Sequence, residues 1–220
     1  RCMVESFLEE ELCFALQVAA LAHDIAHPGR TNQFLIDAEH SLALMYNDQS
    51  PLEHMHAAKL FEITTQSDCA IFIHMSQPVT REVRHAIIDA ILFTDNTKHF
   101  QLITELKMAY DMRRETFDTW AQMYESDPDK HALPQDKVLE AFMTDELRKI
   151  MRTFLLHFCD VSSSCKPWQL CRGWAEALFE EFFLQGDCEL KLGIPVQPLH
   201  DRSTVVVSHS QIGYFEFLML

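Results

Sequence analysis

The densest group of metal-ligating side chains lies in residues 22–34, which have the sequence A-H-D-I-A-H-P-G-R-T-N-Q-F. His23 and Asp24 are adjacent, and His27 follows about one helical turn later. Imidazole nitrogens and carboxylate oxygens are the usual protein ligands of divalent cations, and a carboxylate can bridge two ions. The segment therefore predicts a metal site, although an isolated His-Asp pair on a protein surface is often incidental.

A second candidate ligand, Asp160, follows the largely apolar stretch F-L-L-H-F-C. The helix dipole disfavours an anion at a helix C-terminus, and a nearby cation would offset that cost. The residues alone leave two interpretations open, a metal ligand or a carboxylate that contacts only solvent.

Helix-start and helix-stop signals place both candidates at helix ends. Residues 6–9 (S-F-L-E) are typical of a capping box, and the apolar residues after them recur at helical spacing until Pro28 and Gly29 end the pattern. His23, Asp24 and His27 are then expected on the last turn of this helix and just beyond it.

Similar signals divide the rest of the chain. Residues 50–53 (S-P-L-E) predict a helix that runs to about residue 64, and Thr144 is expected to cap another helix. Loops are expected at 124–137 and 191–203, where proline residues gather. The other predicted helices span about 80–94, 97–114, 144–159, 167–186 and 204–220.

Composition favours one all-α domain of stacked helices that spans residues 1–220. The chain has 48% hydrophobic residues but only 5 Gly and 8 Pro among 220 residues. This balance supplies a sizeable core and few of the turns that a β fold needs. We find no repeat and no linker. Arg1 is not an initiator methionine, and Leu220 lies within an apolar stretch, so both ends are expected to be truncated.

Charge and hydropathy limit the partners. A net charge of −15 disfavours binding of nucleic-acid polymers, whereas a small anionic substrate could bind if metal ions supplied local positive charge.

No apolar run approaches the roughly 18–20 residues that span a bilayer, so no membrane segment is expected in this chain. The seven Cys show no C-x-x-C pair and are expected to be reduced thiols of a cytoplasmic protein, whose parent could still be membrane-attached.

Several separated blocks resemble the catalytic domain of class I 3′,5′-cyclic-nucleotide phosphodiesterases and occur in the family's order. Beyond H-D-I-A-H-P-G-R-T-N-Q-F, the resemblance rests on L-A-L-M-Y-N-D at 42–48, T-D at 94–95, C-D-V-S at 159–162, E-F-F-L-Q-G-D at 181–187 and S-Q-I-G at 210–213. It implies a compact multi-helix fold related to HD domains. It also implies hydrolysis of cyclic AMP, cyclic GMP or both to 5′-nucleoside monophosphates.

The same resemblance implies a site with two divalent ions, zinc and magnesium (or manganese). His23, Asp24 and Asp160 are the expected metal ligands, and Asp24 is expected to bridge the ions. His27 and Asn32 are expected to act at or beside the phosphate.

Three further residues are implied to support the metal site. His56, Thr94 and Glu181 are expected to orient the ligands and the metal-bound waters, with Asp187 bracing the region beside Glu181. Packing alone for His56, and an exposed helix face for Glu181 and Asp187, remain open as alternatives.

Two residues near the end of the chain are implied to bind the nucleotide base. Gln211 matches a purine-binding glutamine, whose amide can donate one hydrogen bond and accept another. Tyr214 stands where the family commonly has a Phe in an aromatic clamp, and a plain core aromatic is the alternative.

Three departures from the family pattern limit this expectation. No H-N-x-x-H element, which in the family supplies a metal ligand and the general acid, precedes His23, and we expect it in the parent reading frame. Glu53 matches the carboxylate that orients this acid and is placed with His27 and Asn32 in the catalytic set. Met55 replaces a family histidine, and Ser163 replaces an asparagine of adenine-preferring members.

Two other functions stay open on the sequence. A catalytically impaired, nucleotide-binding or regulatory module would lack the upstream histidines altogether. An HD-type phosphohydrolase acting on another phosphoester is disfavoured by Gln211 and by the block at 181–187. Regulatory domains are expected in the parent protein.

Overall fold

The computed structural model describes residues 8–131, 138–140 and 144–219. These residues form helices and connecting turns, and no strand lies within these ranges, so the predicted all-α class is confirmed. None of the helices in this part of the chain is both long and apolar enough to cross a membrane. The α-helices are α1 (Glu10–Ala22), α2 (Asn32–Asp37), α3 (Ser41–Met45), α4 (Pro51–Thr64), α5 (Gln77–Leu92), α6 (His99–Asp111), α7 (Arg114–Ser126), α9 (Asp145–Asp160), α10 (Trp168–Leu192) and α11 (Val207–Tyr214).

The chain divides into two compact units. The first comprises residues 1–23 and 63–157, and the second comprises residues 24–62 and 158–220. The single domain expected over 1–220 stays a prediction. The predicted metal ligands His23 and Asp24 lie on either side of the point where the chain passes from the first unit to the second.

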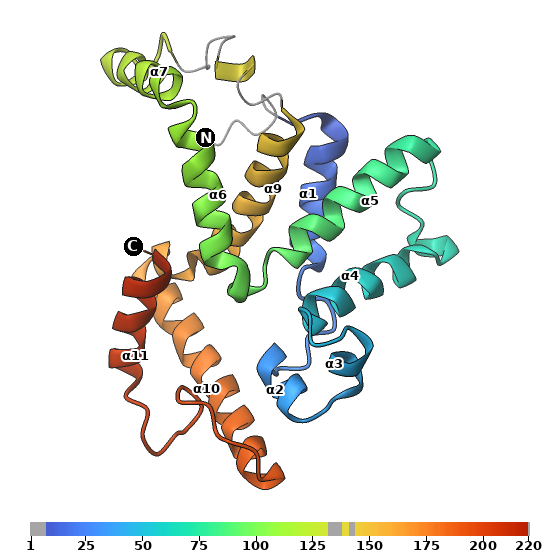
Figure 1. The fold of residues 1–220 in the computed structure, drawn as a ribbon, viewed down its shortest axis with the longest axis vertical. Helices are drawn as coiled ribbons and strands as arrows, with labels where there is room; N and C mark the ends of the chain where they lie inside the picture. The colour runs from blue at the N-terminus through green and yellow to red at the C-terminus, as the bar shows by residue number, and fades with distance from the viewer. Residues whose placement is uncertain (1–7, 132–137, 141–143, 220) are drawn as a thin grey trace. The chain divides into compact units, whose positions relative to one another are not determined.

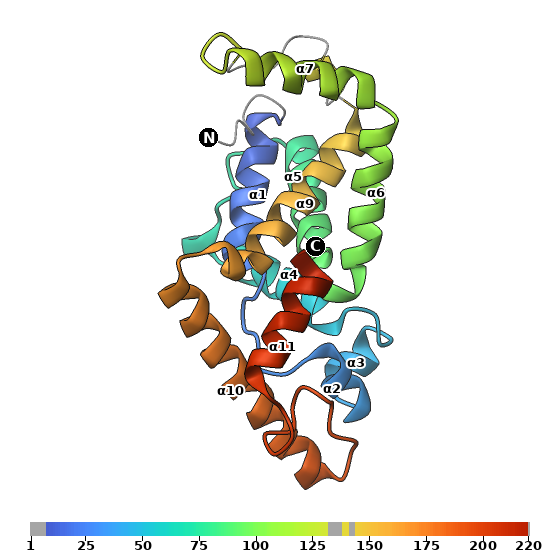
Figure 2. The same ribbon diagram turned by 90° about the vertical axis from the view of Figure 1, so that its left-hand side faces the viewer.

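The first unit is a bundle in which α1, α5, α6 and α9 lie side by side (Figures 1 and 2). Helix α1 packs along α5, and α6 packs on α9 through Ala109, Leu147 and Ile150. Lys149 of α9 reaches Asp89 of α5, with Nζ 3.1 Å from Oδ2. Spacing of three and four residues between the buried side chains gives each helix one apolar face for this core.

The second unit contains α2, α3 and α4 and the long helix α10, beside which α11 runs (Figure 2). Leu35, Ala43 and Leu52 join α2, α3 and α4 in a small apolar core. Helix α2 begins after Thr31, whose hydroxyl accepts a hydrogen bond from the Phe34 N–H, as an N-cap residue does.

Several predicted boundaries differ from the structure. Of the predicted capping box, Ser6 and Phe7 lie outside the described residues, and α1 starts at Glu10. The helix predicted over 97–114 is found as α6, which is shorter because a 3₁₀ turn at Asn96–Lys98 precedes it; helix α7 was not predicted, and it extends to Ser126 into the predicted loop. Residues 127–131 of that loop form a turn, and residues 132–137 lie outside the described residues.

The two helices nearest the C-terminus also differ from their predicted bounds. Helix α10 extends past Gly186 and ends at Gly193, whose φ of +70° is typical of a helix C-terminus. Helix α11 begins at Val207 and is followed by a π-helical turn, Phe215–Met219. The cap at Thr144 is confirmed, because its Oγ1 accepts a hydrogen bond from the Leu147 N–H.

Candidate metal and nucleotide site

The turn after α1 carries the first predicted ligands. His23 follows the last helical residue, and its Nδ1 lies 2.9 Å from the Ala20 carbonyl oxygen. A carbonyl only accepts, so this contact assigns the hydrogen to Nδ1 and leaves the lone pair of a neutral ring on Nε2. That orientation is the usual one for a histidine that binds a metal through Nε2.

Asp24 and Asp160 form the centre of the candidate site in the second unit. Both side chains are exposed, and each places a carboxylate oxygen within 4.8 Å of the other. Asp160 is also the last residue of α9, at the negative end of the helix dipole. Two like charges at this separation repel each other, and a divalent cation between them would reverse the sign of the interaction.

His56 is buried on α4 and faces the Asp24 carboxylate. Its Nδ1 lies 2.7 Å from the Ile25 carbonyl oxygen, and its Nε2 lies 3.8 Å from Asp24 Oδ1. The ring stacks on His27 with 5.6 Å between centroids. One ligand atom each from Asp24, His27 and His56 lies within 4.8 Å of the others, so the structure brings together three residues predicted for this site.

Asn32 and Glu53, both predicted for the catalytic set, are in direct contact. The Asn32 side chain donates to Glu53 Oε2 at 2.8 Å, and its Oδ1 accepts from the Leu52 N–H at 2.9 Å. These two bonds hold the first residue of α2 against the first turn of α4. The Asn32 amide is therefore oriented from both of its ends.

Glu181 of α10 lies against the turn that follows His27. Gly29 has φ of +66°, and a Cβ built on it would lie 3.5 Å from Glu181 Oε2. Glu181 is half-buried here, and its bracing role stays a prediction. Asp187, in contrast, bonds to Arg202 at 2.8 Å on the surface.

The two predicted base-binding residues lie on α11. The Tyr214 hydroxyl donates to the Val161 carbonyl oxygen at 2.9 Å, next to Asp160 in the chain. Burial, together with the negative charge of Asp160, raises the pKa of Tyr214, so this hydroxyl stays protonated at neutral pH. Gln211 is half-buried one turn earlier on the same helix.

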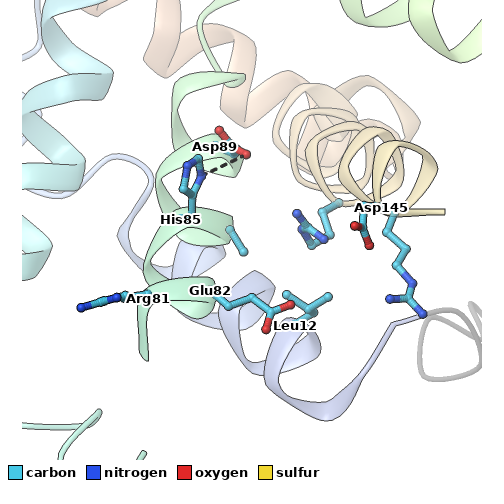
Figure 3. Close-up of a pocket in the computed structure, with 9 residues that line it drawn as sticks. Leu12, Arg81, Glu82, His85, Asp89 and Asp145 are labelled. Carbon is cyan, nitrogen blue, oxygen red and sulfur yellow. Dashed lines mark ion pairs between the residues drawn. The ribbon is translucent and has the colours of Figure 1, made fainter. Parts of the chain in front are cut away.

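Thr94 belongs to the first unit, where its buried hydroxyl donates to the Ile91 carbonyl oxygen at 2.8 Å. The first unit also has a cavity of about 370 Å³, in which His85 and Asp89 of α5 face each other (Figure 3). Arginines and carboxylates line this cavity in equal number, and none of the predicted site residues borders it. The near balance of charge gives no preference for an anion or a cation.

Sequence reasoning assigned no role to Gln185, Glu189 and His200, which form a buried polar cluster within the second unit. Gln185 and Glu189 are four residues apart on α10, a spacing that places two polar side chains on one helix face. That spacing is the only signal the sequence offers, because His200 comes from the following loop.

Comparison with known proteins identifies similar sequences. The family model for 3'5'-cyclic nucleotide phosphodiesterase matches residues 1–220. A human protein described as high affinity cAMP-specific and IBMX-insensitive 3',5'-cyclic phosphodiesterase 8A is 37% identical over 93% of this chain and 24% of its own length. The 3',5'-cyclic-AMP phosphodiesterase, isoform F, of Drosophila melanogaster is 34% identical over 91% of this chain and 28% of its own. The chain thus spans about a quarter of the length of these curated relatives.

Solved structures with the same fold include the phosphodiesterase domain of the RhoPDE fusion protein from the choanoflagellate Salpingoeca rosetta. It superposes with a TM-score of 0.78 at 28% identity, over 97% of this chain and 60% of that one. LmjPDEB1 in complex with IBMX gives the same TM-score at 27% identity, over 98% of this chain and 58% of that one.

Proposed function

Because the chain belongs to the 3'5'-cyclic nucleotide phosphodiesterase family, we propose that it supplies catalytic residues for metal-dependent hydrolysis of 3',5'-cyclic nucleotides to 5'-nucleoside monophosphates. Cyclic AMP is the first substrate to test, since the names of the human and Drosophila relatives specify it. Cyclic GMP is the second, because Ser163 replaces an asparagine of adenine-preferring members.

The observation that carries the proposal is the proximity of Asp24 and Asp160. Their carboxylate oxygens lie within 4.8 Å, although the two residues are far apart in the chain. Exposed carboxylates can avoid each other at little cost, so an arrangement that keeps them together favours a role in holding cations. His56 and His27 beside Asp24 extend this donor set.

The donor chemistry fits zinc at one position and magnesium or manganese at the other. We assign His23, Asp24 and Asp160 to the first ion, because imidazole and carboxylate together suit zinc. We assign Asp24 alone as the shared protein ligand of the second ion, since magnesium keeps most of its waters. When bound, the ions supply positive charge to the phosphate oxygens and acidify a water for attack on phosphorus.

The remaining residues of the set act by orientation. His56, held by the Ile25 carbonyl, keeps Asp24 in place, and Glu181 supports the turn that carries His27. Asn32, oriented by Glu53, is positioned to donate to a phosphate oxygen. We assign Thr94 to the orientation of metal-bound waters, as the family resemblance implies.

Gln211 and Tyr214 are proposed to bind the base. The Gln211 amide would hydrogen-bond the purine edge, and the Tyr214 ring would stack on the purine face. The bond from the Tyr214 hydroxyl to Val161 supports this proposal, because it anchors the ring beside Asp160, where the phosphate would bind.

The test is hydrolysis of both cyclic nucleotides by the full-length protein before and after removal of metal with a chelator. We expect turnover that is lost on chelation and returns with zinc and magnesium. Two results would contradict the proposal: turnover that survives chelation, or nucleotide binding without any turnover in the metal-loaded protein. The second result would indicate a nucleotide-binding module.

A further inference from the structure

A closed polar cluster lies inside the second unit, between α10 and the loop that follows it. Gln185 and Glu189 are each 1% exposed, and His200 is 6% exposed. Burying a carboxylate is costly unless hydrogen bonds or opposite charge compensate for it. A fold that keeps Glu189 in this position therefore gains something that an apolar side chain would not provide.

The hydrogen atoms of the cluster can be assigned one by one. The Gln185 amide nitrogen donates to Glu189 Oε1 at 2.8 Å and to Thr31 Oγ1 at 3.0 Å, which uses both of its hydrogens. His200 Nδ1 lies 3.1 Å from Glu189 Oε1 and 3.2 Å from the Gln185 amide nitrogen. Because both hydrogens of that amide are already used and the carboxylate only accepts, Nδ1 donates to Glu189. The Gln197 N–H donates to Glu189 Oε2 at 3.0 Å.

These bonds keep Glu189 ionised. Burial by itself would raise the pKa of Glu189, but the hydrogen bonds from Gln185, the Gln197 N–H and His200 outweigh it and lower the pKa below its usual value. The carboxylate therefore attracts the amide nitrogen of Gln185 at neutral pH. That attraction allows only one of the two orientations of the Gln185 amide.

The orientation of Gln185 matters because its other end meets the start of α2. Gln185 Oε1 accepts from the Thr31 N–H at 2.8 Å, while the amide nitrogen donates to the Thr31 hydroxyl. Thr31 is the N-cap of α2, and the next residue, Asn32, bonds to Glu53 and to the Leu52 N–H. If the amide turned over, its nitrogen would face the Thr31 N–H, and its oxygen would face the Glu189 carboxylate, so donor would meet donor and acceptor would meet acceptor.

We propose that Glu189 and His200 act as positioning residues for the candidate site, holding the Gln185 amide in the orientation that fixes Thr31 and, through it, Asn32 at the start of α2. The catalytic consequence rests on the proposed function, whereas the positioning itself does not. Neither Glu189 nor His200 would touch the substrate.

Hydrogen exchange tests the positioning in the full-length protein without an activity assay. In Gln185→Leu, the amides of Thr31, Phe34 and Leu52 should exchange about tenfold faster, the change expected for one lost hydrogen bond. Peptides from 57–62 of α4 serve as the internal reference. Gln169→Leu, an exposed glutamine on the same helix, is the matched control and should match the wild type. Unchanged exchange at Thr31, Phe34 and Leu52 would overturn the proposal.

A second pair of variants covers the case in which Gln185→Leu does not fold. Thr31→Ser keeps the hydroxyl that Gln185 contacts, and Thr31→Val removes it while retaining the shape of the side chain. We expect fast exchange at Leu52 in Thr31→Val and near-normal exchange there in Thr31→Ser; Phe34 is not compared, because its N–H bonds directly to the Thr31 hydroxyl. Equal exchange in the two variants would contradict the proposal.

Kinetics separate positioning from a general loss of stability. Gln185→Leu should lower kcat about tenfold with KM nearly unchanged, and combining it with Asn32→Ala should cost less than the sum of the two effects. Additive effects would show that Gln185 does not act through Asn32. If exchange responds as expected but the wild type hydrolyses neither nucleotide, the proposed function fails and the positioning stands.

Discussion

The second unit holds its carboxylates in two opposite ways. Asp24 and Asp160 are exposed and lie close together, so they create a strongly negative potential between them. Glu189 is buried, and donors from Gln185, Gln197 and His200 surround it. The buried carboxylate is held by hydrogen-bond donors inside the fold, whereas we propose that the exposed pair holds a cation.

This difference suggests two separate roles: the exposed carboxylates bind ions, and the buried carboxylate stabilises the fold. A substitution in the exposed pair should remove ion binding and leave the fold intact. A substitution in the buried cluster should affect the fold first, because it leaves donors without an acceptor in a region that water does not reach.

The largest effect is expected for Asp160→Ala in the full-length protein. Loss of a metal ligand removes several kcal/mol of charge stabilisation, so kcat should fall by about a thousandfold or more. The assay is cyclic-nucleotide hydrolysis at saturating metal. Glu176→Ala, an exposed carboxylate of α10 paired with Arg172, is the control and should retain activity. Activity near that of the wild type in Asp160→Ala would contradict the metal assignment.

Glu189→Ala should affect stability instead. Removing one partner of a buried charged cluster should lower the free energy of unfolding by about 3–5 kcal/mol. Urea unfolding of the metal-free protein measures this change. In the same measurement Asp160→Ala should be neutral or slightly stabilising, since it removes a repulsion. Equal destabilisation by the two variants would end the distinction between the two kinds of carboxylate.

His56 shares a property with each kind of carboxylate, because it is buried like Glu189 but faces the exposed Asp24. His56→Ala should lower kcat about 10- to 100-fold by releasing Asp24, the range typical of residues that orient metal ligands. His54, a half-buried histidine of the same helix that stacks on Tyr46, provides the matched variant His54→Ala. If the two variants lose activity equally, His56 serves packing alone.

A smaller effect is expected at the glycine that makes room for the buried cluster. A Cβ on Gly186 would lie 2.1 Å from the His200 carbonyl oxygen, so Gly186→Ala should lower stability by about 1–3 kcal/mol. Gly173 on the same helix has no atom within 4 Å of such a Cβ, and Gly173→Ala should raise stability by about 0.5–1 kcal/mol. Thermal unfolding should show midpoints that move in opposite directions, and shifts of the same sign would contradict this reasoning.

Local signals in the sequence predict a helix boundary best where a capping residue, a proline or a glycine lies at that boundary. Thr144 caps α9 as expected, whereas α1 ends at Ala22, before the Pro28 and Gly29 that were expected to stop it. The end of α6 was predicted within a few residues, but α7, which follows it from Arg114 to Ser126, was not predicted. Gly186 was interpreted as a helix end, yet it lies inside α10 because it packs against the His200 backbone.

In the candidate site, too, the sequence predicts residues with local signals but not the contacts between distant residues. His23, Asp24 and Asp160 could be named because imidazoles and carboxylates at helix ends are visible in one dimension and match a family pattern. The bonds between Thr31 and Gln185 join residues 154 positions apart, and no spacing rule predicts such a pair. Contacts of this kind depend on the packing of α10 against the turn after His27.

The central claim, that Asp24 and Asp160 together hold divalent cations, is tested most directly by titrating Mn²⁺ into the metal-free, full-length protein. The wild type should bind with a stoichiometry near two, and Asp24→Asn should weaken both sites by at least about 100-fold, since this residue would contact both ions. Gln169→Leu should bind as the wild type does. Unchanged affinity and stoichiometry in Asp24→Asn would contradict the account.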